Sequence, residues 1–245
     1  MSTVRPPTPP ASYPLRRTLW PCVAALLGVF LVAEFTSLDL WVQDACYDFA
    51  AGQWRVDENA SLPKALFYTG PKALLIAFGL ACIALLVGPA GWRRRFGLAH
   101  RRRELATVII CLGLAPYLIG LAKANTNMFC PYELTRYGGD VPYVKLFERF
   151  PEHLRPERRG VCFPAGHASG GFALLALSGL AATRRGRLLG LAVGLAVGSW
   201  MGIYQMLKGA HYLSHTLITV LLVWLLFLAC RDVLERAWRN APDSP

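Results

Sequence analysis

Residues 101–123 read RRRELATVIICLGLAPYLIGLAK, and this stretch decides the fold. Three arginines and Glu104 are followed by an uncharged run, residues 105–122, which ends at Lys123. A helix needs about 20 mostly apolar residues to cross the core of a bilayer. Because Lys and Arg collect in short cytoplasmic loops, the pattern predicts a transmembrane helix whose first residues lie on the cytoplasmic side.

Apolar runs of similar length recur on both sides of this stretch, in a chain that is 54% hydrophobic and 17% charged. They cover residues 18–37, 70–89, 167–183, 188–206 and 212–230. Six spans place both chain ends on the same side of the membrane. We therefore predict an all-α, polytopic membrane protein in which residues 18–230 form one domain of six transmembrane helices.

The distribution of charge predicts the orientation of this domain. Four short segments hold 15 of the 26 basic residues: Arg5, Arg16, Arg17, Arg93, Arg94, Arg95, Arg101, Arg102, Arg103, Arg184, Arg185, Arg187, Arg231, Arg236 and Arg239. The longer loops, residues 38–65 and 123–166, carry nine basic residues against ten acids. We expect both termini in the cytoplasm. Arginines dispersed in this way do not form a nucleic-acid groove, so the net charge of +11 indicates topology rather than a nucleic-acid partner.

The segments outside the apolar runs differ in composition. Residues 1–17 are rich in proline and predict a disordered cytoplasmic tail, and residues 231–245 predict a second cytoplasmic tail. Residues 38–54 fit either an interfacial helix or a solvated loop. The outer loop, residues 123–166, is long and rich in aromatic residues, which favours a functional segment over a disordered one. The small-residue pattern Gly190, Gly194, Gly198 favours helix packing within one bundle over dimerisation.

Histidines gather where chemistry is expected. His167 lies in FPAGHASGG, residues 163–171, where proline and glycine precede a helix whose first N–H groups favour phosphate. His211 lies in KGAHYLSH, residues 208–215, and a helix would place Lys208, His211 and His215 on one face. Polar groups at membrane depth are costly, so they are functional candidates.

These motifs resemble those of the type 2 phosphatidic acid phosphatase superfamily, whose pattern is KxxxxxxRP, then PSGH, then SRxxxxxHxxxD. Lys123 to Pro131 matches the first motif, Pro164-Ala165-Gly166-His167 the second, and Tyr204 to His215 the third. Their order, spacing and predicted membrane side agree. The resemblance implies a six-helix bacterial enzyme of the inner membrane that removes or transfers phosphate on lipids without a metal or other cofactor, with its site facing the periplasm.

The resemblance also implies roles for individual residues. His211 attacks phosphorus and forms a phosphohistidine, and His167 protonates the leaving alkoxide. Phosphoryl oxygens are held by Lys123 and by the backbone at Ala165 and Gly166.

Four positions depart from the family pattern: Cys130 and Gln205 replace arginines, Ala165 replaces serine, and His215 replaces aspartate. We expect cations from elsewhere, because neither cysteine nor glutamine imitates an arginine fork on phosphate. The candidates are Lys208, Arg136 and Arg159. We expect Gln205 to remain at the phosphate site, and either Glu133 or Asp140 to supply the missing carboxylate.

Cys130 and Cys162 are predicted to face the oxidising side, where disulfides persist. A bridge between them would fix the first motif to the second; free thiols are the alternative.

Other functions remain open from the sequence. The first is a non-catalytic protein that binds phosphorylated lipids. The second is a metal site, because His211 and His215 have the i, i+4 spacing of zinc-binding helices and His167 could be a third ligand. A transporter is disfavoured, since Glu34 is the sole acid within a span. If the protein is an enzyme, we expect its substrate to be a phospholipid, a polyprenyl diphosphate or lipid A. The sequence makes no prediction of the oligomeric state.

Overall fold

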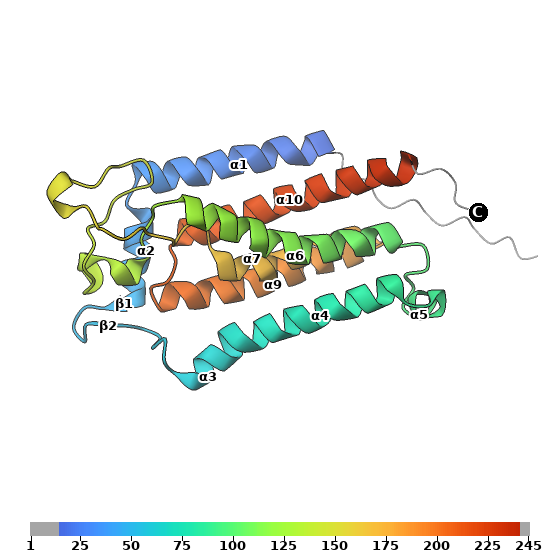
Figure 1. The fold of residues 1–245 in the computed structure, drawn as a ribbon, viewed down its shortest axis with the longest axis horizontal. Helices are drawn as coiled ribbons and strands as arrows, with labels where there is room; N and C mark the ends of the chain where they lie inside the picture. Colours follow the sequence, from blue (N-terminus) through green and yellow to red (C-terminus); the bar gives the residue numbers. More distant parts are fainter. Residues whose placement is uncertain (1–14, 241–245) are drawn as a thin grey trace, which may run out of the picture.

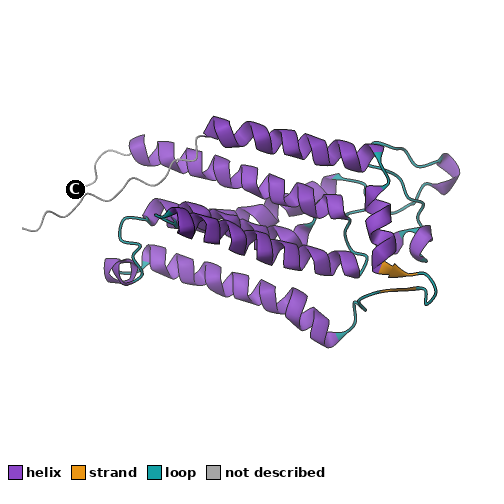
Figure 2. Ribbon diagram, turned by 180° about the vertical axis from the view of Figure 1, so that it is seen from behind, coloured by secondary structure: helices purple, strands orange, loops and turns teal. Residues whose placement is uncertain are grey.

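The computed structural model describes residues 15–240, whose long helices lie side by side along one direction (Figure 1). Five of these helices are long and apolar enough to cross a membrane. They cover Arg17–Phe35, Ser61–Val87, Arg102–Asn125, Arg184–Leu207 and Leu213–Asn240. The predicted all-α membrane fold is confirmed. The strand content of the described chain is limited to two short strands at one end of the bundle, as Figure 2 shows.

The elements follow one another along the chain in this order. First come α1 (Leu15–Phe35), α2 (Leu38–Cys46), the antiparallel pair β1 (Tyr47–Asp48) and β2 (Gln53–Trp54), α3 (Ser61–Lys64), the π-helical turn η1 (Ala65–Thr69), α4 (Gly70–Val87), α5 (Ala90–Arg95) and α6 (Arg102–Asn125). Then follow the short 3-10 turns η2 (Pro131–Glu133), η3 (Thr135–Tyr137) and η4 (Glu152–Leu154), α7 (Gly166–Ala173), the 3-10 turn η5 (Leu174–Ala176), α8 (Leu177–Leu180), α9 (Arg184–Leu207) and α10 (Leu213–Asn240).

The stretch predicted as the fourth span, residues 167–183, is a broken helix rather than one long helix. α7 passes through η5 into α8, and these helical residues reach only about 22 Å at 1.5 Å per residue. That length is short of the roughly 30 Å of a bilayer core. Its apolar residues are instead buried inside the bundle, where Ala168 and Phe172 are at most 1% exposed. Apolar composition alone does not distinguish these two environments.

α9 packs directly against this broken helix through its glycines. A methyl group at Gly194 would lie 2.5 Å from the backbone nitrogen of Leu175, and one at Gly198 would lie 2.1 Å from the ring of Phe172. Only glycine permits such close approach. The small-residue pattern therefore serves packing within the bundle.

The two ends of the bundle differ in chemistry. The first residues of α1, the last residues of α10 and all of α5 lie at one end, which we call the arginine-rich end (Figure 1). There the Arg93 guanidinium caps α4, donating to the carbonyl oxygens of Leu85, Leu86 and Gly88 at 2.9, 3.0 and 2.9 Å. The other end carries α2, the β1–β2 pair and the loop between α6 and α7, and we call it the histidine end.

The helices α1 and α10 extend into the two segments predicted as tails, residues 1–17 and 231–245. Residues 1–14 of the predicted N-terminal tail lie outside the described residues, and α1 begins at Leu15. α10 continues through most of the predicted C-terminal tail as far as Asn240. Ion pairs one turn apart support this extension, from Arg236 to Asp232 at 2.8 Å and from Arg239 to Glu235 at 3.1 Å.

A small aromatic core orders the histidine end. Its buried residues are Tyr47, Phe129, Leu134, Tyr137, Val141 and Tyr212. They come from strand β1, the loop after α6 and the turn before α10. The helical interpretation of residues 38–54 therefore holds for α2, and the remainder forms the β1–β2 pair.

Candidate active site

His211 lies in a turn between α9 and α10, so the prediction of one continuous helix through residues 208–215 is wrong. α9 ends at Leu207, and Gly209 adopts a φ of 74°, which ends a helix readily because glycine has no Cβ. The ring of Trp54 covers Gly209 so closely that a methyl group there would lie 2.3 Å from it. The turn is thereby held in one conformation.

The two histidines at this turn are buried and adjacent. His211 is 2% exposed and His215, in the first turn of α10, is fully buried. Their Nδ1 atoms lie 3.5 Å apart, at the long end of hydrogen bonding, and Cys162 Sγ lies 3.6 Å from His211 Nδ1. Burial, followed by electrostatic interactions with His215 and Lys123, holds the pKa of His211 well below its ordinary value. At neutral pH the His211 imidazole is therefore uncharged and has a free lone pair.

Helix α2 supports the turn from the outside with two buried polar side chains. Gln43 Nε2 donates to the backbone carbonyl of His211, and the Asp39 carboxylate accepts from the backbone N–H of Ser214 at 2.9 Å and from its hydroxyl. Asp39 thus satisfies one free N–H group at the start of α10. Burial raises the pKa of Asp39, whereas the hydrogen bonds from Ser214 lower it.

His167 and Lys123 meet at the N-terminus of α7. Gly166 is the first residue of this helix, and a methyl group on it would lie 3.8 Å from Lys123 Nζ, so the ammonium sits against the first turn. The N–H of Ala165, predicted to contact phosphate, instead donates to Thr219 Oγ1 at 2.9 Å. The phosphate-binding N–H groups are therefore expected one or two residues later, in the first turn of α7.

Gln205 lies in the last turn of α9, and Lys208 directly follows this helix. Lys208 Nζ lies 5.8 Å from the ring centroid of Tyr68 and 5.7 Å from that of Tyr204, and its charge acts on both His167 and His211. Gln205 is 2% exposed, and its backbone carbonyl accepts from Ala210 at 2.7 Å. The structure thus places Lys208 near His167 and His211. Gln205, three residues earlier in the chain, is buried.

Arg136 is placed elsewhere. Its guanidinium binds the carboxylate of Asp44 with two hydrogen bonds, Nε to Oδ1 at 2.8 Å and a terminal nitrogen to Oδ2 at 2.6 Å. Asp44 belongs to α2, so this pair fastens the loop to that helix. Because the fork of Arg136 is already occupied, its prediction as a phosphate ligand does not match the geometry.

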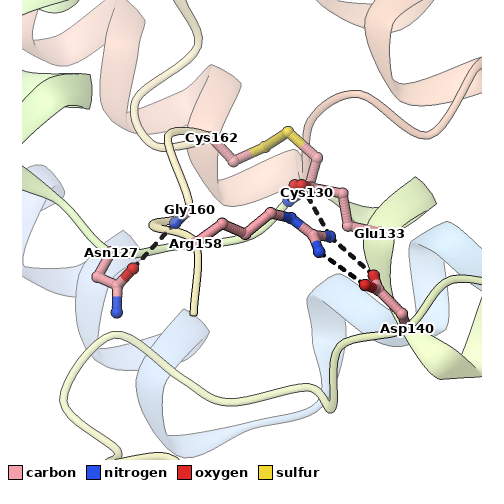
Figure 3. Close-up of polar contacts among 7 residues, drawn as sticks. All are labelled: Asn127, Cys130, Glu133, Asp140, Arg158, Gly160 and Cys162. Carbon is pink, nitrogen blue, oxygen red and sulfur yellow. Dashed lines mark hydrogen bonds and ion pairs between the residues drawn. A yellow bond between two sulfur atoms is a disulfide. The ribbon is translucent and has the colours of Figure 1, made fainter. Parts of the chain in front are cut away.

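The two carboxylates proposed to orient His211 are also engaged by an arginine. Arg158 donates to both oxygens of Asp140 at 2.6 and 2.7 Å and to Glu133 at 3.4 Å (Figure 3). Glu133 also accepts from the backbone N–H of Cys130 at 2.8 Å. Within residues 15–240 the polar contacts of the His211 ring are with His215 and Cys162, and neither carboxylate contacts it. Arg159 donates to the carbonyl of Asn125, at the end of α6.

Cys130 and Cys162 form a disulfide with a Cα to Cα distance of 5.1 Å (Figure 3). It joins segments 32 residues apart, and the backbone N–H of Cys162 also donates to Met128 at 2.8 Å. Because Cys162 contacts His211, the bridge lies directly behind the candidate nucleophile.

Removing this bridge with the pair Cys130→Ser and Cys162→Ser is expected to lower the free energy of unfolding by about 3–4 kcal/mol, since a disulfide closing a loop of this length restricts the unfolded chain. Thermal unfolding of purified protein in detergent measures the loss. A thiol reductant should lower the melting temperature of the wild type and leave that of the double variant unchanged. A wild type indifferent to reductant would contradict the prediction.

The predicted metal alternative meets a specific obstacle. Within residues 15–240, the possible ligand atoms that lie within 4.8 Å of one another come from Cys162, His211 and His215, and this group does not include the predicted third ligand, His167. However, the Cys162 sulfur is bonded to Cys130 and is not a thiolate, the form in which cysteine binds metals. This leaves two imidazoles that face each other.

An apolar cavity of about 600 Å³ reaches Lys123 and His167. Its walls are residues of α4 and α6 such as Leu75, Ile83 and Leu112, and its polar end carries Lys72, Lys123 and His167. A long apolar cavity with cations at one end is suited to an amphipathic molecule with an anionic head.

Comparison with known proteins agrees with this geometry. The family model of the PAP2 superfamily matches residues 104–239, more than half of the chain, and includes Lys123, His167 and His211. The chain belongs to the PAP2 superfamily. The matched region covers α6, the loop that follows it and all later helices of this PAP2 chain. The resemblance seen in the three motifs is thereby confirmed.

One curated relative is the lipid A 4'-phosphatase of Francisella tularensis subsp. novicida (strain U112). It is 25% identical over 154 residues, which cover 61% of this PAP2 chain and 66% of the relative, just under two thirds of its length. No solved structure matches the chain. Together the matches identify a multi-pass membrane protein of a lipid phosphatase family.

Several residues at the site were not foreseen. Gln43 binds the backbone of His211, and Thr219 binds the backbone of Ala165, the residue before α7. Tyr68 contacts the ring of His167. Gln43 and Tyr68 lie outside the region matched by the PAP2 family model, and a single polar or aromatic residue at those positions gives no local signal. Asp39 had one weak signal, an acid on the polar face of a predicted interfacial helix.

Proposed function

We propose that this chain is a membrane lipid phosphatase or phosphotransferase that acts through a phosphohistidine on His211. The observation that carries the proposal is the convergence of a buried, uncharged His211 with His167 and Lys123, which come from three different segments. The acceptor of the phosphoryl group is water or the hydroxyl of another lipid. The substrate is a phosphorylated lipid: a phospholipid, a polyprenyl diphosphate or lipid A.

In the proposed first step, His211 Nε2 attacks phosphorus, because Nδ1 faces His215 and Cys162. The bond between phosphorus and the alkoxide oxygen breaks, and His167 gives its proton to that oxygen. In the second step, the acceptor hydroxyl attacks the phosphohistidine and loses its proton to His167. His211 is then restored and phosphate, or a new phosphate ester, leaves.

His215 takes the place of the orienting aspartate in this scheme. As a neutral ring it can accept a hydrogen bond from His211 Nδ1–H, which fixes the ring and its tautomer. Unlike a carboxylate, it does not neutralise the charge that His211 gains during attack.

We assign the phosphoryl oxygens to Lys123, Lys208 and the first-turn N–H groups of α7, with Gly166 allowing close approach. Within residues 15–240 neither lysine forms an ion pair with a carboxylate, so both ammonium groups remain available for phosphate. Acyl or prenyl chains would occupy the apolar cavity between α4 and α6, so that the substrate enters from the lipid phase.

The proposed location is the inner membrane of a bacterium, with the histidine end in the periplasm. The basic residues of the arginine-rich end support this orientation, because positively charged loops stay in the cytoplasm. A disulfide at the histidine end fits the oxidising side of that membrane.

The test uses the purified full-length chain and vesicles that contain a lipid monophosphate, a polyprenyl diphosphate or lipid A. We expect phosphate release, or phosphate transfer to an added lipid alcohol, from at least one lipid, and the same rate after exhaustive chelation. Rapid quenching with a ³²P-labelled substrate should trap label that is stable to base and labile to acid, as a phosphohistidine is. Folded protein that neither releases nor transfers phosphate from any of these lipids would contradict the proposal and favour a protein that only binds phosphorylated lipids.

A further inference from the structure

The π-helical turn η1 joins α3 to α4 and lies outside the region that matches the family model. π-helical turns are rare and occur frequently at functional sites. Here the wide turn closes with the backbone N–H of Gly70 donating to the carbonyl of Ala65, and a methyl group at Gly70 would lie 2.6 Å from that oxygen. The turn directs two consecutive aromatic residues, Phe67 and Tyr68, to the bundle.

Phe67 anchors the turn on α9. Its ring stacks on Trp200 at a centroid distance of 4.7 Å and an interplanar angle of 16°, and on Tyr204 at 5.4 Å and 10°. Such contacts between aromatic faces fix the turn relative to α9 and therefore to the residues that follow α9.

Tyr68, the next residue, contacts both cationic and acid-base groups of the site. Its half-buried ring lies 4.2 Å from the ring of His167, centroid to centroid, at an angle of 38°. The ammonium of Lys208 lies 5.8 Å from the centroid of the same ring. Tyr68 is thus an aromatic surface shared by the proposed general acid and one of the proposed phosphate ligands.

We infer that Tyr68 is a positioning residue, whose ring holds the protonated imidazole of His167 in place for proton donation to the leaving group. The inference rests on the proposed function and adds a residue that no motif contains.

The Tyr68 ring can offset repulsion between His167 and the cations around it. The charged groups that act on His167 are Lys123 from α6, Lys208 after α9 and Lys72 from α4, and His211 lies near enough to interact as well. Burial, and then these three cations, lower the pKa of His167 to about 4, so the surroundings oppose the charged imidazolium that the reaction requires. The electron-rich face of an aromatic ring attracts a cation and offsets part of this repulsion. The same contact restricts rotation of the His167 ring.

The leaving group provides a sharp test. An alkoxide needs a proton as the bond to phosphorus breaks, whereas a phenoxide leaves readily without one. Dodecyl phosphate and 4-dodecylphenyl phosphate carry the same chain and differ in that requirement. Because the same protein sample hydrolyses both, the ratio of their kcat/KM values does not depend on the fraction of protein that is folded.

For Tyr68→Leu we expect kcat/KM to fall about 10-fold with dodecyl phosphate and less than about 3-fold with 4-dodecylphenyl phosphate, mostly through kcat. Tyr68→Phe keeps the ring and should remain within about twofold of wild type on both substrates. The matched control is Tyr117→Leu, which removes a tyrosine that is 62% exposed on α6. It should behave as the wild type does.

Three results would overturn the inference while the proposed function stands: wild-type rates for Tyr68→Leu, equal losses on both substrates, or a loss in Tyr68→Phe as large as in Tyr68→Leu. Equal losses would mean that the ring only supports the fold. A wild-type protein that neither releases nor transfers phosphate from these substrates or from any lipid phosphate would contradict the proposed function and the inference together.

Discussion

Replacing His211 with alanine is expected to lower the rate of phosphate release at least about 10⁴-fold, the largest effect of any single change in this chain. The change removes the atom that bonds to phosphorus, and no other described side chain within the turn can take its place. The backbone contact from Gln43 to residue 211 survives the substitution, so the turn keeps its support. The measurement is kcat with the best lipid substrate, together with the loss of trapped label in the quench experiment.

The matched control for this change is His153→Ala. His153 is an exposed histidine in the 3-10 turn η4, within the loop between α6 and α7. It should retain the wild-type rate. A His211→Ala protein that keeps a tenth of the activity or more would exclude the phosphohistidine mechanism, whatever the fate of the control.

Replacing His167 with alanine is expected to lower kcat/KM for dodecyl phosphate about 10²- to 10³-fold, in the range that general acid catalysis contributes. The loss should be less than about 10-fold with 4-dodecylphenyl phosphate, because its leaving group needs little protonation. With labelled 4-dodecylphenyl phosphate, label should still be trapped on His211 in this variant, since departure of that leaving group needs little proton donation from His167.

The comparison of the two histidine variants separates their roles. In His211→Ala, kcat/KM should fall by the same factor on both substrates. In His167→Ala, it should fall mainly on the alkyl ester, dodecyl phosphate. If His167→Ala lost both substrates by the same factor, His167 would bind phosphate rather than donate a proton. A Lys123→Met variant, which removes a proposed phosphate ligand, provides the pattern expected for that outcome.

Much of the site was predictable because its parts are encoded locally. The spacing around Lys123, His167 and His211 carries the family pattern, and the apolar runs between them fix which end of the bundle each residue reaches. The bend at Gly209 also had a local signal, since glycine after a helix commonly takes a positive φ. It was missed because the i, i+4 spacing of His211 and His215 also fits a continuous helix.

The partners of charged residues were not predictable in this way. Arg136 pairs with Asp44, which lies 92 residues earlier. Local sequence patterns do not indicate which residues so far apart in the chain come into contact. The broken helix α7–α8 shows a second limit: burial within the bundle and burial in lipid select the same apolar residues.

The polar link between α2 and the histidine turn has a consequence for how such chains can recombine. Gln43 and Asp39 lie well before the region that matches the family model, and their partners, His211 and Ser214, lie within it. A crossover between two relatives anywhere from residue 47 to residue 204 would combine an α2 from one parent with a turn from the other. Both parents would then need compatible side chains at these positions, so residues 38–46 and 205–215 should be inherited as one linked unit.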